Sequence, residues 1–194
     1  AEGCKYGDFQ YDIDEKSDTF MRRGVFSCYQ PVADDVPMPE EQRELGYDAW
    51  LNLILLAYVD RKKVFDTYAD YYLSTSGQTY WSDTHQLSDY YDNYHELLTQ
   101  QLGEADKASD PITEIYVPRA RLADFMAAAR TDFRRHEVNV IYGTIRLIEQ
   151  DDESFLAWAT QPWACIIFNI HTVHTPAGIE HSRQTFRRLI DLAL

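Results

Sequence analysis

The stretch that decides the fold runs from Ile112 to Ile148, "ITEIYVPRARLADFMAAARTDFRRHEVNVIYGTIRLI". A β-branched run ends at Pro118, an amphipathic helix pattern with basic residues near its end follows, and the segment 139–148 alternates like a strand. Further along, "WACIIFNIHT" predicts another strand, and Pro176 precedes the helical pattern "AGIEHSRQTFRRLIDLAL". This β-α-β-β-α order predicts an α+β fold, with a ferredoxin-like antiparallel sheet that has its helices on one face.

The residues before this core predict an N-terminal extension of strands and helices. "KYGDFQYDID" and "GVFSCYQPV" are short, aromatic and β-branched, which is typical of strands. Apolar residues at three- and four-residue spacing predict helices between 45 and 102, where Ser88 is a candidate cap and Gly103 a candidate end. We therefore expect one domain over 1–194, with a β/helical part at 1–109 and the ferredoxin-like core at 110–194.

Composition and charge limit the classes of partner. The formal net charge is −14, from 18 basic and 32 acidic residues, and such a surface repels phosphate backbones, so we expect no nucleic acid partner. No apolar run is long enough for a membrane span, and no signal-peptide pattern opens the sequence. The three cysteines form no CxxC motif; we expect Cys28 and Cys165 to be buried thiols and the protein to be cytoplasmic.

The strand predictions place polar side chains together on one face of the sheet. Side chains along a strand alternate between its faces, so Arg146 lies opposite Ile145 and Leu147. Applied to all three strands of the core, the same alternation collects Glu114, Tyr116, Tyr142, Thr144, Arg146, Asn169 and His171 on the face without helices. In a ferredoxin-like order the third strand lies between the other two, so this face is a candidate polar cavity. The alternative is that the face is simply solvated.

Other candidate sites carry weaker signals. Trp81, Asp83 and His85 lie in an irregular connector, where binding loops often occur, although such connectors are often only packed turns. His171 and His174 are three apart in an extended segment and point to opposite faces, so no metal site is expected. The sequence has no serine elbow, no Walker loop and no GxGxxG motif.

A family resemblance enters at "ITEIYVPRARLADFMAAARTDFRRHEVNVIYGTIRLIEQDDESFLAWA" and at the later "NIHT". This stretch resembles the C-terminal substrate (cap) domain of FAD-linked oxidoreductases of the vanillyl-alcohol-oxidase type, and it covers residues 110–194 best. "YGDFQYDID", "RGVFSCYQPV" and "YWSDTHQLS" are similar to bacterial members of the same group. The resemblance implies that FAD is bound mainly by an N-terminal domain of the same polypeptide, which we expect to be absent from these 194 residues.

The resemblance also implies a function and roles for residues. It implies the substrate-binding domain of a flavin-dependent enzyme that oxidises a hydroxylated or hydroxy-acid small molecule by hydride transfer to FAD, inactive as this fragment alone. Glu114 and Arg146 match family positions and are the candidate catalytic residues. The candidate substrate-binding residues are Tyr116, Tyr142, Thr144, Asn169 and His171. The alternatives are a stand-alone ferredoxin-like module that binds a ligand or forms a homodimer, and a purely structural domain.

Overall fold

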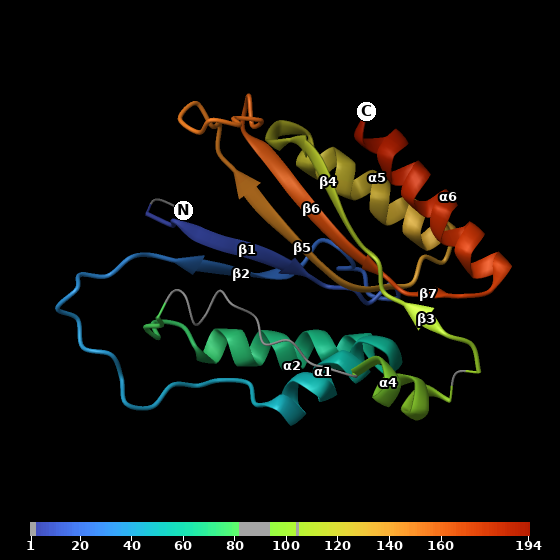
Figure 1. Ribbon diagram of the computed structural model, residues 1–194, viewed down its shortest axis with the longest axis horizontal. Helices are drawn as coiled ribbons and strands as arrows, with labels where there is room; N and C mark the ends of the chain where they lie inside the picture. Colours follow the sequence, from blue (N-terminus) through green and yellow to red (C-terminus); the bar gives the residue numbers. More distant parts are fainter. Residues whose placement is uncertain (1–2, 82–93, 104) are drawn as a thin grey trace.

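The computed structural model describes residues 3–81, 94–103 and 105–194 (Figure 1). The N-terminal half contains, in chain order, strands β1 (Tyr6–Tyr11) and β2 (Gly24–Tyr29) and helices α1 (Tyr47–Val59), α2 (Arg61–Ser74) and α4 (Tyr94–Leu102). The C-terminal half contains β3 (Ala108–Ser109), β4 (Ile112–Pro118), the 3₁₀ turn η1 (Arg119–Arg121), α5 (Leu122–Arg135), β5 (Val140–Ile148), β6 (Trp163–Ile170), β7 (Thr172–Val173) and α6 (Pro176–Ala193).

Five antiparallel strands form the main sheet, in the order β2-β1-β5-β6-β4. The α+β prediction is confirmed, and β6 lies between β5 and β4, as a ferredoxin-like order requires. The N-terminal hairpin extends this sheet, because β1 pairs with β5. A second, small sheet pairs β3 with β7.

Helices α5 and α6 cover one face of the sheet and enclose the hydrophobic core (Figure 1). Val117 of β4, Phe168 of β6 and Leu189 of α6 are each at most 1% exposed. Both helices bury one face, because their apolar residues recur at helical spacing. Helix α6 begins with Pro176, and the hydroxyl of Thr175 accepts a hydrogen bond from the amide of Gly178.

The helices of the N-terminal extension lie on the opposite side of the sheet (Figure 1). The expectation of helices on one face holds for the core helices α5 and α6, and α1 and α2 of the N-terminal extension cover the other face. The Tyr58 hydroxyl at the end of α1 donates to Asp110 at 2.6 Å, and its ring meets that of His171 at a centroid distance of 5.1 Å. The Arg61 guanidinium at the start of α2 donates one hydrogen bond to the Glu15 carboxylate, at 2.5 Å, and another to the side-chain oxygen of Asn139. These contacts fix the α1–α2 junction at one end of the sheet.

A buried tyrosine joins the hairpin to the core. Tyr11 is 2% exposed, and its hydroxyl donates to the backbone carbonyl of Ile167, 156 residues along the chain, at 2.7 Å. The ring crosses directly over Gly143 of β5, where an added Cβ would lie 1.9 Å from the phenol oxygen. Glycine is therefore required at 143 by the close approach of Tyr11.

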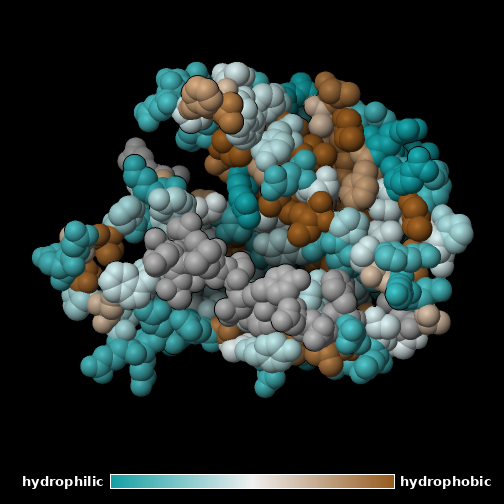
Figure 2. Space-filling model, viewed as in Figure 1, coloured by the Kyte–Doolittle hydropathy of each residue, from teal (hydrophilic) through white to brown (hydrophobic). Residues whose placement is uncertain are grey.

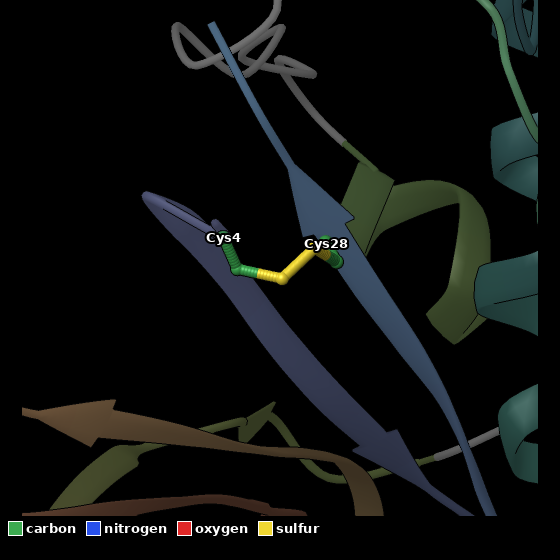
Figure 3. Close-up of a disulfide and its surroundings, with 2 residues drawn as sticks. All are labelled: Cys4 and Cys28. Atoms are coloured by element: carbon green, nitrogen blue, oxygen red, sulfur yellow. A yellow bond between two sulfur atoms is a disulfide. The ribbon is translucent and has the colours of Figure 1, made fainter. Parts of the chain in front are cut away.

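A disulfide staples the start of the chain to the outermost strand (Figure 3). Cys4 and Cys28 are bonded, with their Cα atoms 5.5 Å apart, and Cys28 is exposed. The prediction of a buried Cys28 thiol is wrong, whereas Cys165 is a buried free cysteine. Because disulfides persist mainly in oxidising compartments, the cysteine content no longer supports a cytoplasmic location.

Some predictions fall outside the described residues: the Ser88 cap and the connector residues Asp83 and His85. Helix α4 ends before Gly103, whose φ of 65° suits a helix end. No helix within the described ranges is both long enough and apolar enough to cross a membrane.

Replacing Gly143 tests the contact between Tyr11 and β5. Gly143→Ala forces the tyrosine ring to move, and we expect the free energy of unfolding to fall by about 2 kcal/mol, the usual scale for overpacking. Gly46→Ala is the matched control, because a Cβ there meets nothing within 4 Å. Urea unfolding measures both variants, and equal stability of the two would contradict the close approach of Tyr11 to Gly143.

Thiol counting tests the disulfide. Unfolded without reductant, the protein should show one reactive thiol, from Cys165, and after reduction it should show all three. Closing a loop of 24 residues stabilises a fold by about 3 kcal/mol, so the double variant Cys4→Ser/Cys28→Ser should lose about that much. Three thiols in the unreduced, freshly purified protein would show that the bond is absent.

Candidate functional site

A cavity of about 1860 Å³ lies between the sheet and the helices α1 and α2. Its floor is the sheet face opposite α5 and α6, and its roof is formed by side chains of α1 and α2, among them Trp50, Tyr68 and Tyr72. Figure 2 shows hydrophilic and hydrophobic side chains interspersed over the face of the molecule that is in view. The polar face is therefore a partly enclosed ligand-sized space, not an open solvated surface.

The predicted site residues divide into two groups in the structure. Those that line the cavity are Glu114, Tyr116, Tyr142, Arg146 and Asn169. Thr144 faces the same side but is fully buried, and its hydroxyl donates to Asp8 at 2.8 Å. His171 lies between β6 and β7, where its Nδ1 is 2.8 Å from Asp110. Alternation along the strands thus places five of the seven predicted residues at the cavity, but it does not show that Thr144 and His171 are hydrogen-bonded to Asp8 and Asp110.

An irregularity in β5 sets which residues face the cavity. The pairing shifts between Val140, opposite Ile170, and Tyr142, opposite Asn169, so Ile141 is an additional residue in the strand. Val140 and Ile170 both belong to the hydrophobic core, whereas Tyr142 and Asn169 both line the cavity. Simple alternation would place Ile141 on the core face together with Ile145; Ile141 does belong to the core, but it also lines the cavity.

A row of reactive side chains crosses the cavity floor. Phe9 lies opposite Ile145 and Gln10 opposite Thr144, so the next residue of β1, Asp8, comes opposite Arg146. Cys165 of β6 lies opposite Arg146 on one side and opposite Tyr116 of β4 on the other. The row across the cavity floor is Asp8, Arg146, Cys165 and Tyr116, all of which line the cavity.

Hydrogen bonds set the chemistry at the β4 end of this row. The Tyr116 hydroxyl donates to Glu114 at 2.6 Å, and this bond, together with desolvation, raises the pKa of Tyr116. Burial raises the pKa of the Cys165 thiol, so it is protonated near neutral pH and is a poor nucleophile. Glu114 thus accepts a hydrogen bond from Tyr116 in the resting structure and is the hydrogen-bond acceptor at this end of the row.

Several cavity residues come from segments distant in sequence. Asp8 and Gln10 come from β1, Tyr29 from β2, and Tyr68 and Tyr72 from α2. Alternation along "YGDFQY" places Asp8 and Gln10 on one face, but no sequence pattern shows that β1 pairs with β5. These residues were missed because the pairing joins segments more than 130 residues apart.

The structure also bears on cofactors and relatives. In the described part of the chain, no group of three or more His, Cys, Asp or Glu side chains is placed to hold a metal ion. Comparisons with models of protein families, with curated proteins and with solved structures find no match.

Tyrosines that line the cavity predict a loss of stability at high pH. Burial first, and then the charge of Asp8, raises the pKa of Tyr142 to about 12, and burial also raises that of Tyr72 to about 12. Below pH 10 these phenols are neutral in both the folded and unfolded states. As the pH rises above about 10, the unfolded chain ionises while the folded one does not, so the free energy of unfolding falls.

Thermal unfolding between about pH 9 and about pH 11 measures this linkage. The decline of Tm with pH should be shallower in Tyr142→Phe than in the unchanged protein. Tyr6→Phe is the control, because Tyr6 is 58% exposed, and its slope should be unchanged. An identical slope for Tyr142→Phe and the unchanged protein would show that the fold does not raise the pKa of the Tyr142 phenol.

Proposed function

We propose that this chain is the substrate-binding domain of an FAD-dependent oxidoreductase that oxidises a hydroxylated or hydroxy-acid small molecule. One observation carries the proposal: the polar sheet face that matches the family positions opens onto a cavity into which Arg146 and Glu114 both project from the floor. The size of the cavity also supports it. The cavity, at about 1860 Å³, exceeds the roughly 300–1,000 Å³ of an ordinary ligand pocket. It therefore has room for a substrate beside a flat ring system.

The residues present fit the ring of a flavin better than its pyrophosphate. Aromatic side chains and the Asn169 amide line the cavity, and the Asn169 Oδ1 is buried without a hydrogen-bond partner among the described residues. In contrast, the sequence has no glycine-rich stretch of the kind that cradles a pyrophosphate at a helix N-terminus. This supports the proposal that FAD is held mainly by a separate domain of the same polypeptide.

The chain's own groups would bind the substrate and take its proton. Arg146 is exposed to the cavity, forms no ion pair with any described residue, and would hold a substrate hydroxyl or carboxylate by charge-assisted hydrogen bonds. Glu114 lies two strands away, roughly 10 Å at the backbone, because β6 separates β4 from β5. A small substrate spans this gap over Cys165.

In this proposal, Glu114 at the β4 end of the cavity takes the substrate proton. As the C–H bond next to oxygen breaks and its hydride leaves, the O–H proton passes to the Glu114 carboxylate, and a carbonyl forms. Bound flavin would supply the hydride acceptor. Tyr116, already hydrogen-bonded to Glu114 at 2.6 Å, keeps that carboxylate oriented toward the substrate.

A stand-alone ligand-binding module is the second candidate. It is favoured by the fact that this chain alone lines the cavity from both sides, by the sheet and by α1 and α2. The two candidates differ in whether substrate reduces a flavin. A ligand that binds without any flavin reduction in the full-length polypeptide would favour the module.

Replacing Arg146 tests the enzyme proposal. In the flavin-containing full-length polypeptide, Arg146→Ala should lower kcat/KM by more than about tenfold, the scale of one lost charge-assisted contact. Arg121→Ala is the matched control, because Arg121 is 71% exposed and its ion pair with Asp124 lies on the surface. Unchanged kinetics in Arg146→Ala, measured by flavin reduction, would remove Arg146 from the site.

A further inference from the structure

One end of the cavity is built around a carboxylate and a group of phenols. We call it the Asp8 pocket, and its members are Asp8, Tyr29, Tyr68, Tyr72 and Tyr142. The tyrosines come from β2, α2 and β5, so the pocket is assembled from both the floor and the roof of the cavity. The Tyr68 and Tyr72 rings are neighbours, with their centroids 4.4 Å apart and their planes tilted by 35°, and Tyr68 is only 5% exposed.

The charge of Asp8 has only a neutral partner. Thr144 donates one hydrogen bond to it at 2.8 Å, and no basic side chain of the described residues forms an ion pair with it. Arg146 is its neighbour across the sheet, yet the two are not ion-paired and both line the cavity. Asp8 therefore keeps acceptor capacity that a ligand can use.

The charge balance of the lining favours a cationic ligand over an anionic one. Among the described residues, the acidic ones that line the cavity are Asp8, Glu44, Asp110 and Glu114, and the basic ones are Lys5 and Arg146. The whole chain carries a formal charge of −14, and a concave site in an acidic protein concentrates cations. Desolvation, and to a smaller extent the charge of Asp8, raises the pKa of Tyr142 and of Tyr72, so these phenols remain neutral hydrogen-bonding groups.

We propose that the Asp8 pocket binds the protonated amine of a polyhydroxylated ligand. An ammonium group donates to the Asp8 carboxylate and to phenol oxygens, and aromatic rings attract its charge. Hydroxyl groups on the rest of the ligand reach Arg146, one strand away. The inference shares one premise with the proposed function, which is that this cavity holds the ligand. It does not depend on the flavin.

A series of three ligands tests this with a single change of charge. Glucamine, sorbitol and gluconate share a six-carbon polyhydroxylated chain and end in an ammonium, a hydroxyl and a carboxylate. Isothermal titration or NMR titration of the 194-residue chain at neutral pH should give the order glucamine, then sorbitol, then gluconate. Glucamine should bind about tenfold tighter than sorbitol, the difference between a charge-assisted and a neutral hydrogen bond.

Two variants locate the preference. Asp8→Asn keeps an oxygen for the Thr144 hydroxyl but removes the charge, and it should abolish the advantage of glucamine over sorbitol. Asp124→Asn is the matched control, because Asp124 is 75% exposed on α5, on the other side of the sheet, and the advantage should persist. If Asp8→Asn fails to fold, the order of the three ligands on the unchanged protein still tests the preference for an ammonium group.

The outcomes separate this inference from the proposed function. Equal or tighter binding of sorbitol or gluconate, binding of none of the three, or a glucamine advantage that survives Asp8→Asn overturns the inference. Preference for glucamine that disappears in Asp8→Asn supports it, whether or not the full-length polypeptide reduces a flavin. Flavin reduction by a neutral or anionic substrate alone supports the proposed function while contradicting the ammonium pocket.

Discussion

The contact between Tyr11 and β5 is the constraint on which the rest of the structure depends. The phenol passes over Gly143 and bonds to the carbonyl of Ile167, so it fixes the N-terminal hairpin against two strands of the C-terminal core at once. This holds β1 beside β5, where a buried hydrogen bond and aromatic contact with Phe168 stabilise it. Because of that pairing, Asp8 arrives next to Arg146 and the helices that follow the hairpin return across the polar face.

The polar face becomes a candidate site because the two pairs of helices pack against the sheet at different distances. Helices α5 and α6 pack closely against apolar side chains and leave no room for a ligand. Helices α1 and α2 are anchored mainly at one end, through Tyr58 and Arg61, and tyrosines line the space that they roof. Phenols combine an apolar ring with a polar tip, which suits a cavity that is partly wet. The outcome is a cavity with acceptors at both ends and Arg146 between them.

The C-terminal core could be read from the sequence because its signals are local. Alternation in 112–118 and 139–148 and the amphipathic pattern of the helix between them predicted the elements, the sheet order and most of the polar face. The cavity could not be predicted, because its roof depends on contacts between segments far apart in the chain. No periodic pattern shows that Tyr68 and Tyr142 line one cavity, or that Cys4 bonds to Cys28. The additional residue Ile141 likewise shifts the alternation by a pairing that only the folded sheet defines.

The central claim is that the sheet face opposite α5 and α6 is a ligand site roofed by α1 and α2. The most direct measurement is a crystal structure of the protein grown with a polyhydroxylated small molecule. The account predicts ligand density between the Arg146 guanidinium and helix α2, in contact with residues of both the sheet and the helix. Density confined to the outer surface, or α2 packed directly onto Tyr142 and Arg146 with no space between them, would contradict it.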